Sequence, residues 1–269
     1  MRRIGLALAL LGVLACTPAK QQAGDPDLAV GGGDLGVDLK SGGKDLKADL
    51  AGGADDILGT LGGACNQVLA ELTSSSPSLH FDTLGFVSGE QYAPAALSTG
   101  GVTLYNTPNA GGSSTESEVM SFEVLHFCEG ATLLKTETEI AYDPAPDGGS
   151  NAITDILVEI DGKRVGVSVT RAYKPQSQGA QTDTEVKALL EKKLTGINAS
   201  SVRVSAGDKW VKQILHVFSA TTASRDAIER VWPTIDATLR ADTIVLVTTT
   251  TGGGFIYCDP DPALGSECP

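Results

Sequence analysis

The sequence lacks the short motifs that identify several common enzyme classes. It contains no P-loop, no GxSxG nucleophile elbow, no HExxH zinc motif and no CxxC pair. It has only three histidines, of which His126 and His216 lie inside apolar runs and His80 stands alone. A Ser-His-Asp site would need groups from separate segments, so the two histidines in apolar runs are interpreted as core residues. These absences leave P-loop, serine-hydrolase and zinc-protease chemistry without a sequence signal.

Positive charge is also scarce. The chain has 20 Lys and Arg against 33 Asp and Glu, a net charge of −13, which opposes non-specific attraction to nucleic acid or anionic lipid headgroups. The distribution is uneven, because residues 161–212 carry ten Lys or Arg and five Asp or Glu, a net +5. This segment could form a basic face, or its cations could pair with the acidic helix over 114–128 and the tether over 16–56. Nucleic acid is therefore a partner that the sequence allows without favouring, and no protein partner is indicated.

The first fifteen residues have the pattern of an export signal. Met1-Arg2-Arg3 precedes an apolar run over residues 4–15, which is too short to cross a bilayer as a stable helix. We therefore predict a signal peptide over residues 1–15.

The residues that follow this run resemble the bacterial lipobox. In that motif, small residues such as those of Val13-Leu14-Ala15 precede a cysteine, here Cys16. The resemblance implies that Cys16 is lipidated and becomes the mature N-terminus, which anchors the exported chain to the membrane. Thr17, in place of an acidic residue, implies sorting to an outer membrane. The alternative is an ordinary signal peptide with an incidental cysteine.

Residues 16–56 have the composition of a flexible tether. They are rich in Gly and Asp, and an Asp-Leu pair recurs with its Asp at positions 27, 34, 38, 45 and 49. Isolated leucines in such a background cannot bury enough apolar area to offset the entropy of ordering the chain. We therefore predict a disordered spacer that follows the lipidated N-terminus. A calcium-binding repeat is the alternative, but the irregular intervals disfavour it.

Four further cysteines predict disulfides in an exported chain. They are Cys65, Cys128, Cys258 and Cys268, an even number that allows three pairings. Pairing Cys258 with Cys268 closes the shortest loop and costs the least entropy. Buried free thiols are the alternative, and the absence of CxxC spacing disfavours zinc.

The most informative stretch is the hairpin over residues 153–173. Asp161-Gly162 between two apolar runs is a strong signal for a two-residue turn with positive φ at both positions. Counting back from this turn pairs Ile160 with Lys163 and places Asp155 opposite Ser168. One face then carries Asp155, Ser168, Thr170 and Ile153, while the other is an apolar surface of Ile156, Val158, Ile160, Val165, Val167 and Val169 that helices must cover.

The remaining periodicity indicates a mixed α/β fold. An N-terminal extension over residues 57–113, packed on the core, is predicted to hold a short helix over 57–72 and extended pieces at 79–87 and 102–106. The core over residues 114–258 begins with a helix over 114–128 and a strand over 131–143. After the hairpin come a helix over 182–196, a strand over 210–218, a helix over 224–240 kinked near Pro233, a strand over 243–249 and a short strand at 255–258. Residues 259–269 form a tail. We therefore predict a mixed central sheet flanked by helices, in the order helix-strand-strand-strand-helix-strand.

This order of elements resembles the core of the PD-(D/E)xK, or restriction-endonuclease-like, superfamily. In that superfamily a helix glutamate, an aspartate on the second strand, and an acid two residues before a lysine on the third strand converge on magnesium. The resemblance implies that Asp155 takes the aspartate position and Glu118 or Glu123 the helix position, with Asp155 as a magnesium ligand. Magnesium is the cofactor that this reading implies, and no other cofactor is indicated.

The third strand departs from the superfamily pattern. Ser168 and Thr170 stand where the acid and the lysine are expected, which predicts a catalytically degenerate fold used for binding or structure. The alternative is an active metal-dependent nuclease in which a lysine of the next helix, such as Lys187 or Lys193, replaces the missing one. The charged residues of that helix are Glu185, Lys187, Glu191, Lys192 and Lys193, and their position opposite an apolar stripe favours a solvated face. A ligand-binding or adhesive module is the third hypothesis.

Overall fold

The computed structural model describes residues 58–87, 92–110, 115–145 and 151–257. Several predictions lie outside these ranges: the signal peptide 1–15, Cys16, the tether 16–56, Cys258, Cys268 and the tail 259–269. Within the described ranges, no helix is both long enough and apolar enough to cross a membrane.

A single seven-stranded sheet organises the described residues, in the order β1-β2-β7-β6-β5-β4-β3. Strands β2, β7, β6 and β5 are parallel to one another, and β1, β4 and β3 add antiparallel pairs at the two sides. The predicted mixed α/β fold is therefore confirmed. The strands are β1 (Thr60–Gly62), β2 (Ser78–Gly85), β3 (Thr132–Thr136), β4 (Ile156–Ile160), β5 (Lys163–Ala172), β6 (Lys212–Ser219) and β7 (Ile244–Thr251).

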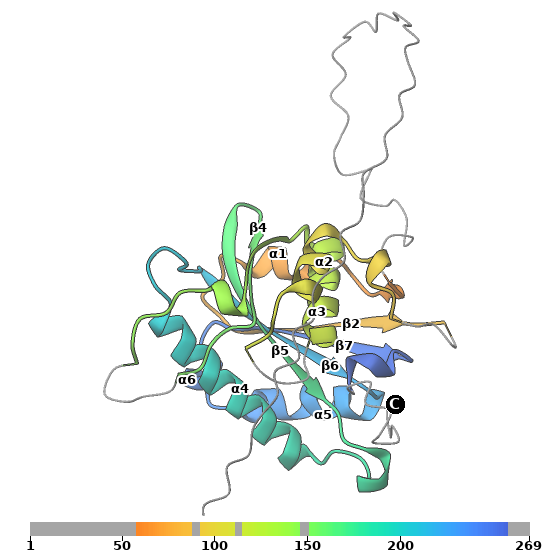
Figure 1. Ribbon diagram of the computed structural model, residues 1–269. Coiled ribbons are helices and arrows are strands. Elements are labelled where there is room, and N and C mark those ends of the chain that lie inside the picture. Colours follow the sequence, from red (N-terminus) through yellow and green to blue (C-terminus); the bar gives the residue numbers. More distant parts are fainter. Residues whose placement is uncertain (1–57, 88–91, 111–114, 146–150, 258–269) are drawn as a thin grey trace, which may run out of the picture. The chain divides into compact units, whose positions relative to one another are not determined.

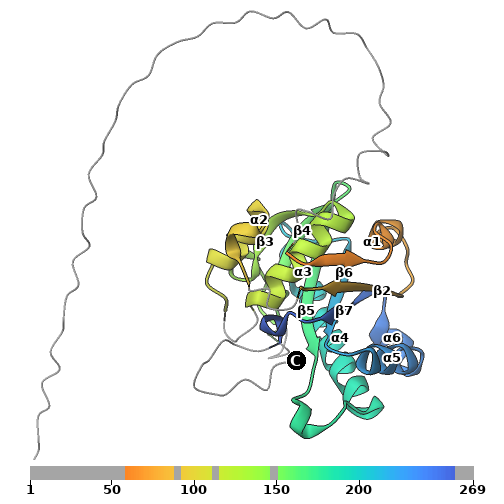
Figure 2. The ribbon, with the colours of Figure 1, turned by 90° about the vertical axis from the view of Figure 1, so that its right-hand side faces the viewer.

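Helices cover both faces of the sheet, as Figures 1 and 2 show. On one face, α3 (Thr115–Glu129) packs on the apolar side of the hairpin, including Val165 and Val167, while α1 (Gln67–Glu71) packs on β2 and β7 and α2 (Thr99–Asn106) packs on α3 and β3. On the other face, α4 (Asp183–Arg203) and α5 (Thr222–Val231) pack on β6, whose Leu215 and Val217 belong to the same core cluster, and α6 (Ala237–Arg240) packs on α4. The short 3₁₀ turns are η2 (Pro94–Ala96), η3 (Glu137–Glu139), η5 (Gln176–Gln178), η6 (Trp232–Thr234) and η7 (Gly254–Ile256).

The predicted hairpin and its register are confirmed. Asp161 and Gly162 have φ angles of 49° and 68°, the positive values that a tight two-residue turn requires. Ile160 pairs with Lys163, and the ladder runs back to Ile156 opposite Val167. The apolar side chains of both strands are buried against α3, as the alternation predicted.

The N-terminal part of the chain differs from the sequence expectation. The segment 57–113 was predicted to pack on the core as an extension. Its strands β1 and β2 instead belong to the same sheet as the strands of the core. The helix predicted over 57–72 is shorter, because residues 60–62 pair with β2 and only Gln67–Glu71 are helical. The extended piece predicted at 102–106 is wrong, since these residues belong to α2. Ser98 caps that helix by accepting a hydrogen bond from the backbone N–H of Gly101 at 3.1 Å.

Three predictions near the C-terminus also need correction or refinement. Helix α4 continues through Gly196 to Arg203, because Ile197 and Ser200 extend its buried stripe. The helix predicted over 224–240 breaks at Pro233 into α5, η6 and α6. The residues predicted as a last strand at 255–258 begin instead in the turn η7.

Helix α3 crosses the sheet at a fully buried polar cluster. The Nδ1 atom of His216 lies 2.8 Å from the Ser121 hydroxyl oxygen, and its Nε2 atom lies 2.7 Å from the Thr248 hydroxyl oxygen. Burial lowers the pKa of His216 to about 3, so the ring is neutral and each ring nitrogen has a hydroxyl partner. The interpretation of His216 as a core residue is therefore confirmed.

A disulfide attaches α1 to the end of α3. Cys65 and Cys128 form this bond across a sequence separation of 63 residues, which identifies one of the three pairings that the sequence left open. Beside it, the Glu129 carboxylate accepts a hydrogen bond from the backbone N–H of Leu69 at 3.0 Å. By loop-closure entropy, such a crosslink stabilises the fold by about 4 kcal/mol, which suits a helix as short as α1.

Candidate functional site

The candidate site lies where β4 and β5 separate. Strand β4 pairs with β5 only as far as Ile156 opposite Val167, whereas β5 continues to Ala172. Beyond this point the backbone of β5 needs other partners on the side that β4 has left. We call this place, formed by Asp155, Ser168, Val169 and Thr170, the strand fork.

Asp155 supplies the hydrogen-bond partners of β5 at the strand fork, where β4 has ended. Its backbone N–H donates to the carbonyl oxygen of Val167 at 3.1 Å. Its carboxylate oxygen Oδ2 then accepts a hydrogen bond from the backbone N–H of Val169 at 2.6 Å. The side chain of Asp155 thus continues the pairing by one step after the strand itself ends.

Lys193 of α4 binds the other backbone polar group of Val169. Its Nζ atom donates to the carbonyl oxygen of Val169 at 2.9 Å. Because the N–H and C=O groups of one strand residue point to the same side, Asp155 and Lys193 meet at the same edge of β5. The carboxylate of Asp155 and the ammonium group of Lys193, whose helix α4 covers the face of the sheet opposite α3, therefore bind the backbone of the same residue, Val169.

Two glutamates approach the strand fork from the α3 side. Glu118, in the first turn of α3, is buried, and its Oε1 atom accepts a hydrogen bond from Asn109 at 3.0 Å. Glu137, in η3, accepts a hydrogen bond from the backbone N–H of Ala110 at 2.9 Å. Both charges are close enough to disfavour ionisation of Asp155.

The environment raises the pKa of Asp155 to about 7. Burial is the largest cause, and the negative charge of Glu118 acts in the same direction. The positive charge of Lys193 and the hydrogen bond from Val169 oppose this rise without cancelling it. Asp155 therefore changes its protonation state near neutral pH.

The structure brings some of the predicted site residues together and separates others. Asp155 and Lys193 bind the backbone of Val169 at the strand fork, where Ser168 and Thr170 are buried on β5, and Glu118 is near enough for its charge to raise the pKa of Asp155. Glu123 has a different partner. Its buried carboxylate accepts hydrogen bonds from the Ser98 hydroxyl at 2.6 Å and the Ser98 backbone N–H at 3.1 Å. That side chain holds the start of α2.

The other charged residues of α4 also have local roles. Lys187 donates to the carbonyl oxygen of Thr234 at 3.2 Å and lies 3.9 Å from Glu191. Glu185 completes the predicted capping box with Thr182 and pairs with Lys174 at 2.7 Å. Of the two candidate replacement lysines, Lys193 reaches the strand fork and Lys187 contacts η6.

The residues present do not form a ready magnesium site. Within the described ranges, no group of three or more His, Cys, Asp or Glu side chains is placed to hold a metal ion. The carbonyl oxygen of Val169, a hard ligand beside Asp155, already binds the ammonium of Lys193. Glu137 was missed by the sequence reasoning, because it lies in a turn within a segment that was predicted as continuous strand.

Most cations of the basic segment have a hydrogen-bond or ion-pair partner, but within the described ranges only four of them pair with a carboxylate: Lys163, Lys174, Lys187 and Lys212. Of its ten Lys and Arg, nine form an ion pair or a hydrogen bond with groups of the described chain: Lys163, Arg164, Arg171, Lys174, Lys187, Lys193, Arg203, Lys209 and Lys212. Lys212 is buried, donates to the carbonyl oxygen of Ser74 and lies 3.7 Å from Asp242. The carboxylate partners are Asp161, Glu185, Glu191 and Asp242, none of which lies on the acidic helix α3, and the tether lies outside the described residues.

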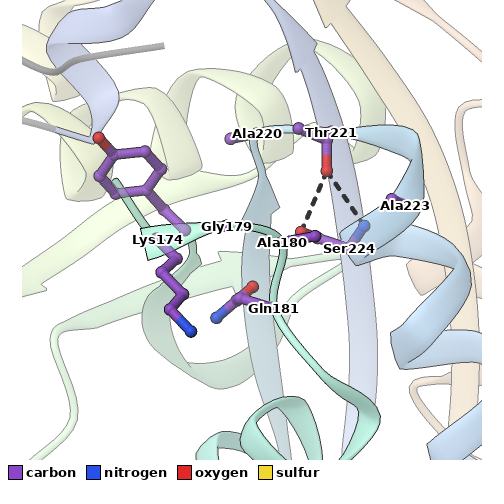
Figure 3. A pocket seen from close by; sticks show the side chains of 9 residues that line it. Lys174, Gly179, Ala180, Gln181, Ala220, Thr221, Ala223 and Ser224 are labelled. Carbon is purple, nitrogen blue, oxygen red and sulfur yellow. Dashed lines mark hydrogen bonds between the residues drawn. The ribbon is translucent and has the colours of Figure 1, made fainter. Parts of the chain in front are cut away.

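A separate pocket lies at the carboxyl ends of β5 and β6 (Figure 3). Its cavity volume is about 280 Å³, and it is lined by Tyr173, Lys174, Gly179, Ala180, Gln181, Ala220, Thr221, Ala223 and Ser224. The wall is mainly apolar. Thr221 caps α5 at its edge, accepting from the Ser224 backbone N–H at 3.1 Å. The buried Oε1 atom of Gln181 has no hydrogen-bond partner among the described residues.

Comparison with known proteins assigns the chain to no family. No protein-family model matches it. The AAC-rich mRNA clone AAC4 protein of Dictyostelium discoideum is 42% identical over 167 residues, which is 60% of this chain. The chain spans only 24% of the length of that relative. Among solved structures, Pyrococcus furiosus SfsA in complex with Ca²⁺ aligns with a TM-score of 0.27 and 12% identity, over 55% of this chain and 70% of that chain. This structural similarity is too low to support a comparison of fold or function.

The raised pKa of Asp155 predicts a pH-dependent stability. The native state holds this proton up to about pH 7, whereas the unfolded chain releases it near its ordinary value of 3.8. Stability therefore falls as pH rises from about 4 to 7 and is constant above that range. Relative to Asp155→Asn, the wild-type chain should lose roughly 1 to 3 kcal/mol between pH 4.5 and 8, measured by urea unfolding.

The matched control for this measurement is Glu159→Gln, which removes an exposed carboxyl group from the same hairpin. The comparison uses differences between variants, because burial also raises the pKa of Asp82 to about 7 and adds to the total slope. Equal pH slopes for the wild-type chain and Asp155→Asn would contradict the prediction.

Proposed function

We propose that the chain is a lipid-anchored protein of the cell envelope whose folded domain binds a ligand and does not cleave nucleic acid. The strand fork carries this proposal. The position at which a metal-dependent nuclease needs an acid and a lysine on β5 holds Ser168 and Thr170, and the nearby carbonyl oxygen of Val169 is bonded to Lys193. Phosphodiester hydrolysis by this route requires a metal that polarises the phosphate and activates water. Two carboxylates, one of them with a raised pKa, are a weak ligand set for that ion.

The pocket at the ends of β5 and β6 supports the binding role. In sheets of parallel strands, ligands commonly bind beyond the carboxyl ends of the strands. The apolar wall suits a small molecule with an apolar body. The cap of α5 at Thr221 and the backbone of Gly179, with a φ of 76°, fix the shape of the opening (Figure 3).

An active metal-dependent nuclease is the second candidate. One observation favours it: Asp155 and Lys193 bind the backbone of Val169 at the strand fork, and Glu118, from another element, is near enough for its charge to raise the pKa of Asp155. In this alternative Lys193 supplies the positive charge that Thr170 lacks. The hydrogen bond from Lys193 to Val169 would then have to open for a metal ion to enter.

The membrane location rests on the sequence alone. The lipobox-like Val13-Leu14-Ala15-Cys16 and the Gly- and Asp-rich residues that follow it support an anchored domain on a spacer. Thr17 supports the outer membrane as the destination.

The absence of nuclease activity is the first expected outcome. The purified chain in detergent, incubated with single- and double-stranded DNA and with RNA plus Mg²⁺ or Mn²⁺, should leave all substrates intact on a gel. Asp155→Ala and Lys193→Met serve as site variants, and Asp161→Ala serves as a control in the exposed turn. Cleavage that the two site variants abolish and Asp161→Ala retains would establish the nuclease alternative.

The pocket is expected to bind a small molecule with an apolar body. Benzamide is a suitable probe, because it offers a ring for the apolar wall. Titration followed by ¹H–¹⁵N correlation spectra should shift the resonances of residues 173–181 and 220–224. Ala223→Leu, at an exposed pocket position, should reduce these shifts at least tenfold. Ala237→Leu is the matched control, because it adds the same atoms to an exposed alanine of α6 outside the pocket. Shifts that both variants retain would place the binding elsewhere.

Anchoring is expected to depend on Cys16. In a Gram-negative host, the wild-type chain should be recovered in the outer-membrane fraction, and Cys16→Ser should lose incorporation of radiolabelled palmitate. Thr17→Asp should keep the label but move to the inner membrane. Palmitate incorporation by Cys16→Ser equal to that of the wild-type chain would rule out this lipid site.

A further inference from the structure

The strand fork gathers the kind of atoms that bind hard cations. The carboxylates of Asp155 and Glu118 and the carbonyl oxygen of Val169 are oxygen ligands, which suit Mg²⁺ and Mn²⁺ better than nitrogen or sulfur does. The negative charge of Glu118 acts on Asp155 and disfavours its ionisation. A positive charge nearby opposes this effect, and the fold supplies one.

That charge is the ammonium group of Lys193. Its Nζ atom lies 2.9 Å from the carbonyl oxygen of Val169 and is close enough to Asp155 to stabilise its ionised form. Leu190 and Leu194, one turn before and one residue after Lys193, are fully buried and fix the orientation of this part of α4. The lysine side chain is thus directed at the strand fork by the packing of its own helix.

We propose that the ammonium group of Lys193 is the resident cation of the strand fork and keeps divalent metal ions out of it. A divalent ion at the Val169 carbonyl would take the hydrogen-bond acceptor of Lys193 and place two positive charges beside a half-buried ammonium group. This inference rests on the proposed function, because it gives the physical reason why the fork lacks metal chemistry. It also identifies Lys193 as the residue that decides whether the site accepts a metal.

The test is Mn²⁺ binding by the full chain in detergent, measured by electron paramagnetic resonance and by calorimetry. The wild-type chain is expected to show no Mn²⁺ binding that depends on Asp155, so that its titration matches that of Asp155→Asn. Lys193→Met should gain one saturable site, at least tenfold tighter than any binding by the wild-type chain. The double variant Lys193→Met/Asp155→Asn should lose this gain. Lys192→Met is the matched control, because it removes an exposed lysine from the preceding position of α4 and should gain no Mn²⁺ site.

Two results would overturn the inference. One is saturable Mn²⁺ binding by the wild-type chain that Asp155→Asn removes. The other is a folded Lys193→Met that gains no site. Near-UV circular dichroism checks folding, and Lys193→Gln replaces Lys193→Met if that variant does not fold. If neither variant folds, the comparison of the wild-type chain with Asp155→Asn decides alone.

The two proposals fail in different ways. A wild-type chain that binds Mn²⁺ through Asp155 but cleaves no nucleic acid overturns the role of Lys193 and leaves the proposed function intact. Cleavage that depends on Asp155 overturns the proposed function.

Discussion

The structure depends most on how the backbone N–H and C=O groups of one residue, Val169, are hydrogen-bonded at the strand fork. Where β4 ends, Val169 would expose a buried N–H and a buried C=O, and each unpaired group would cost free energy comparable to a lost hydrogen bond. Asp155 binds the N–H and Lys193 binds the C=O. This arrangement lets the neighbouring strands diverge without leaving polar backbone unpaired. It also fixes the position of α4 relative to β5, and it places an acid and a base side by side in a half-buried environment.

The sequence predicted the hairpin best because its signals are local and mutually consistent. The Asp-Gly turn sets the register, and the alternation of apolar residues sets the buried face, so the position of Asp155 opposite the end of the β5 ladder follows from counting. The same reasoning could not choose between Glu118 and Glu123, or between Lys187 and Lys193. These pairs differ by one or two helical turns, and the choice depends on partners far away in the sequence. The carboxylate of Glu123 accepts a hydrogen bond from Ser98, which lies 25 residues earlier in the sequence. Ser98 caps α2, a helix that the sequence reasoning did not predict.

The other errors have a similar physical origin. Gly196 reads as a helix end, but the buried residues that follow it on α4 favour continuation more than one glycine disfavours it. Residues 60–62 match a helical pattern in isolation, yet pairing with β2 makes them a strand, because tertiary contacts decide the structure of short segments. The disulfide between Cys65 and Cys128 is a different case, because it belongs to the same one of the three pairings as Cys258 with Cys268, which loop length favours.

That disulfide also has a mechanical consequence. Strand β1 lies at the edge of the sheet and pairs only with β2, over three residues. A pull on the chain before Thr60 would open this pairing one residue at a time, since the hydrogen bonds of an edge strand can break in sequence. The opening would stop at Cys65, because the covalent bond to Cys128 transfers the load to α3, the most deeply buried helix on its face of the sheet. In a domain held by its N-terminus, β1 would act as a yielding segment and the disulfide as the stop that protects the core.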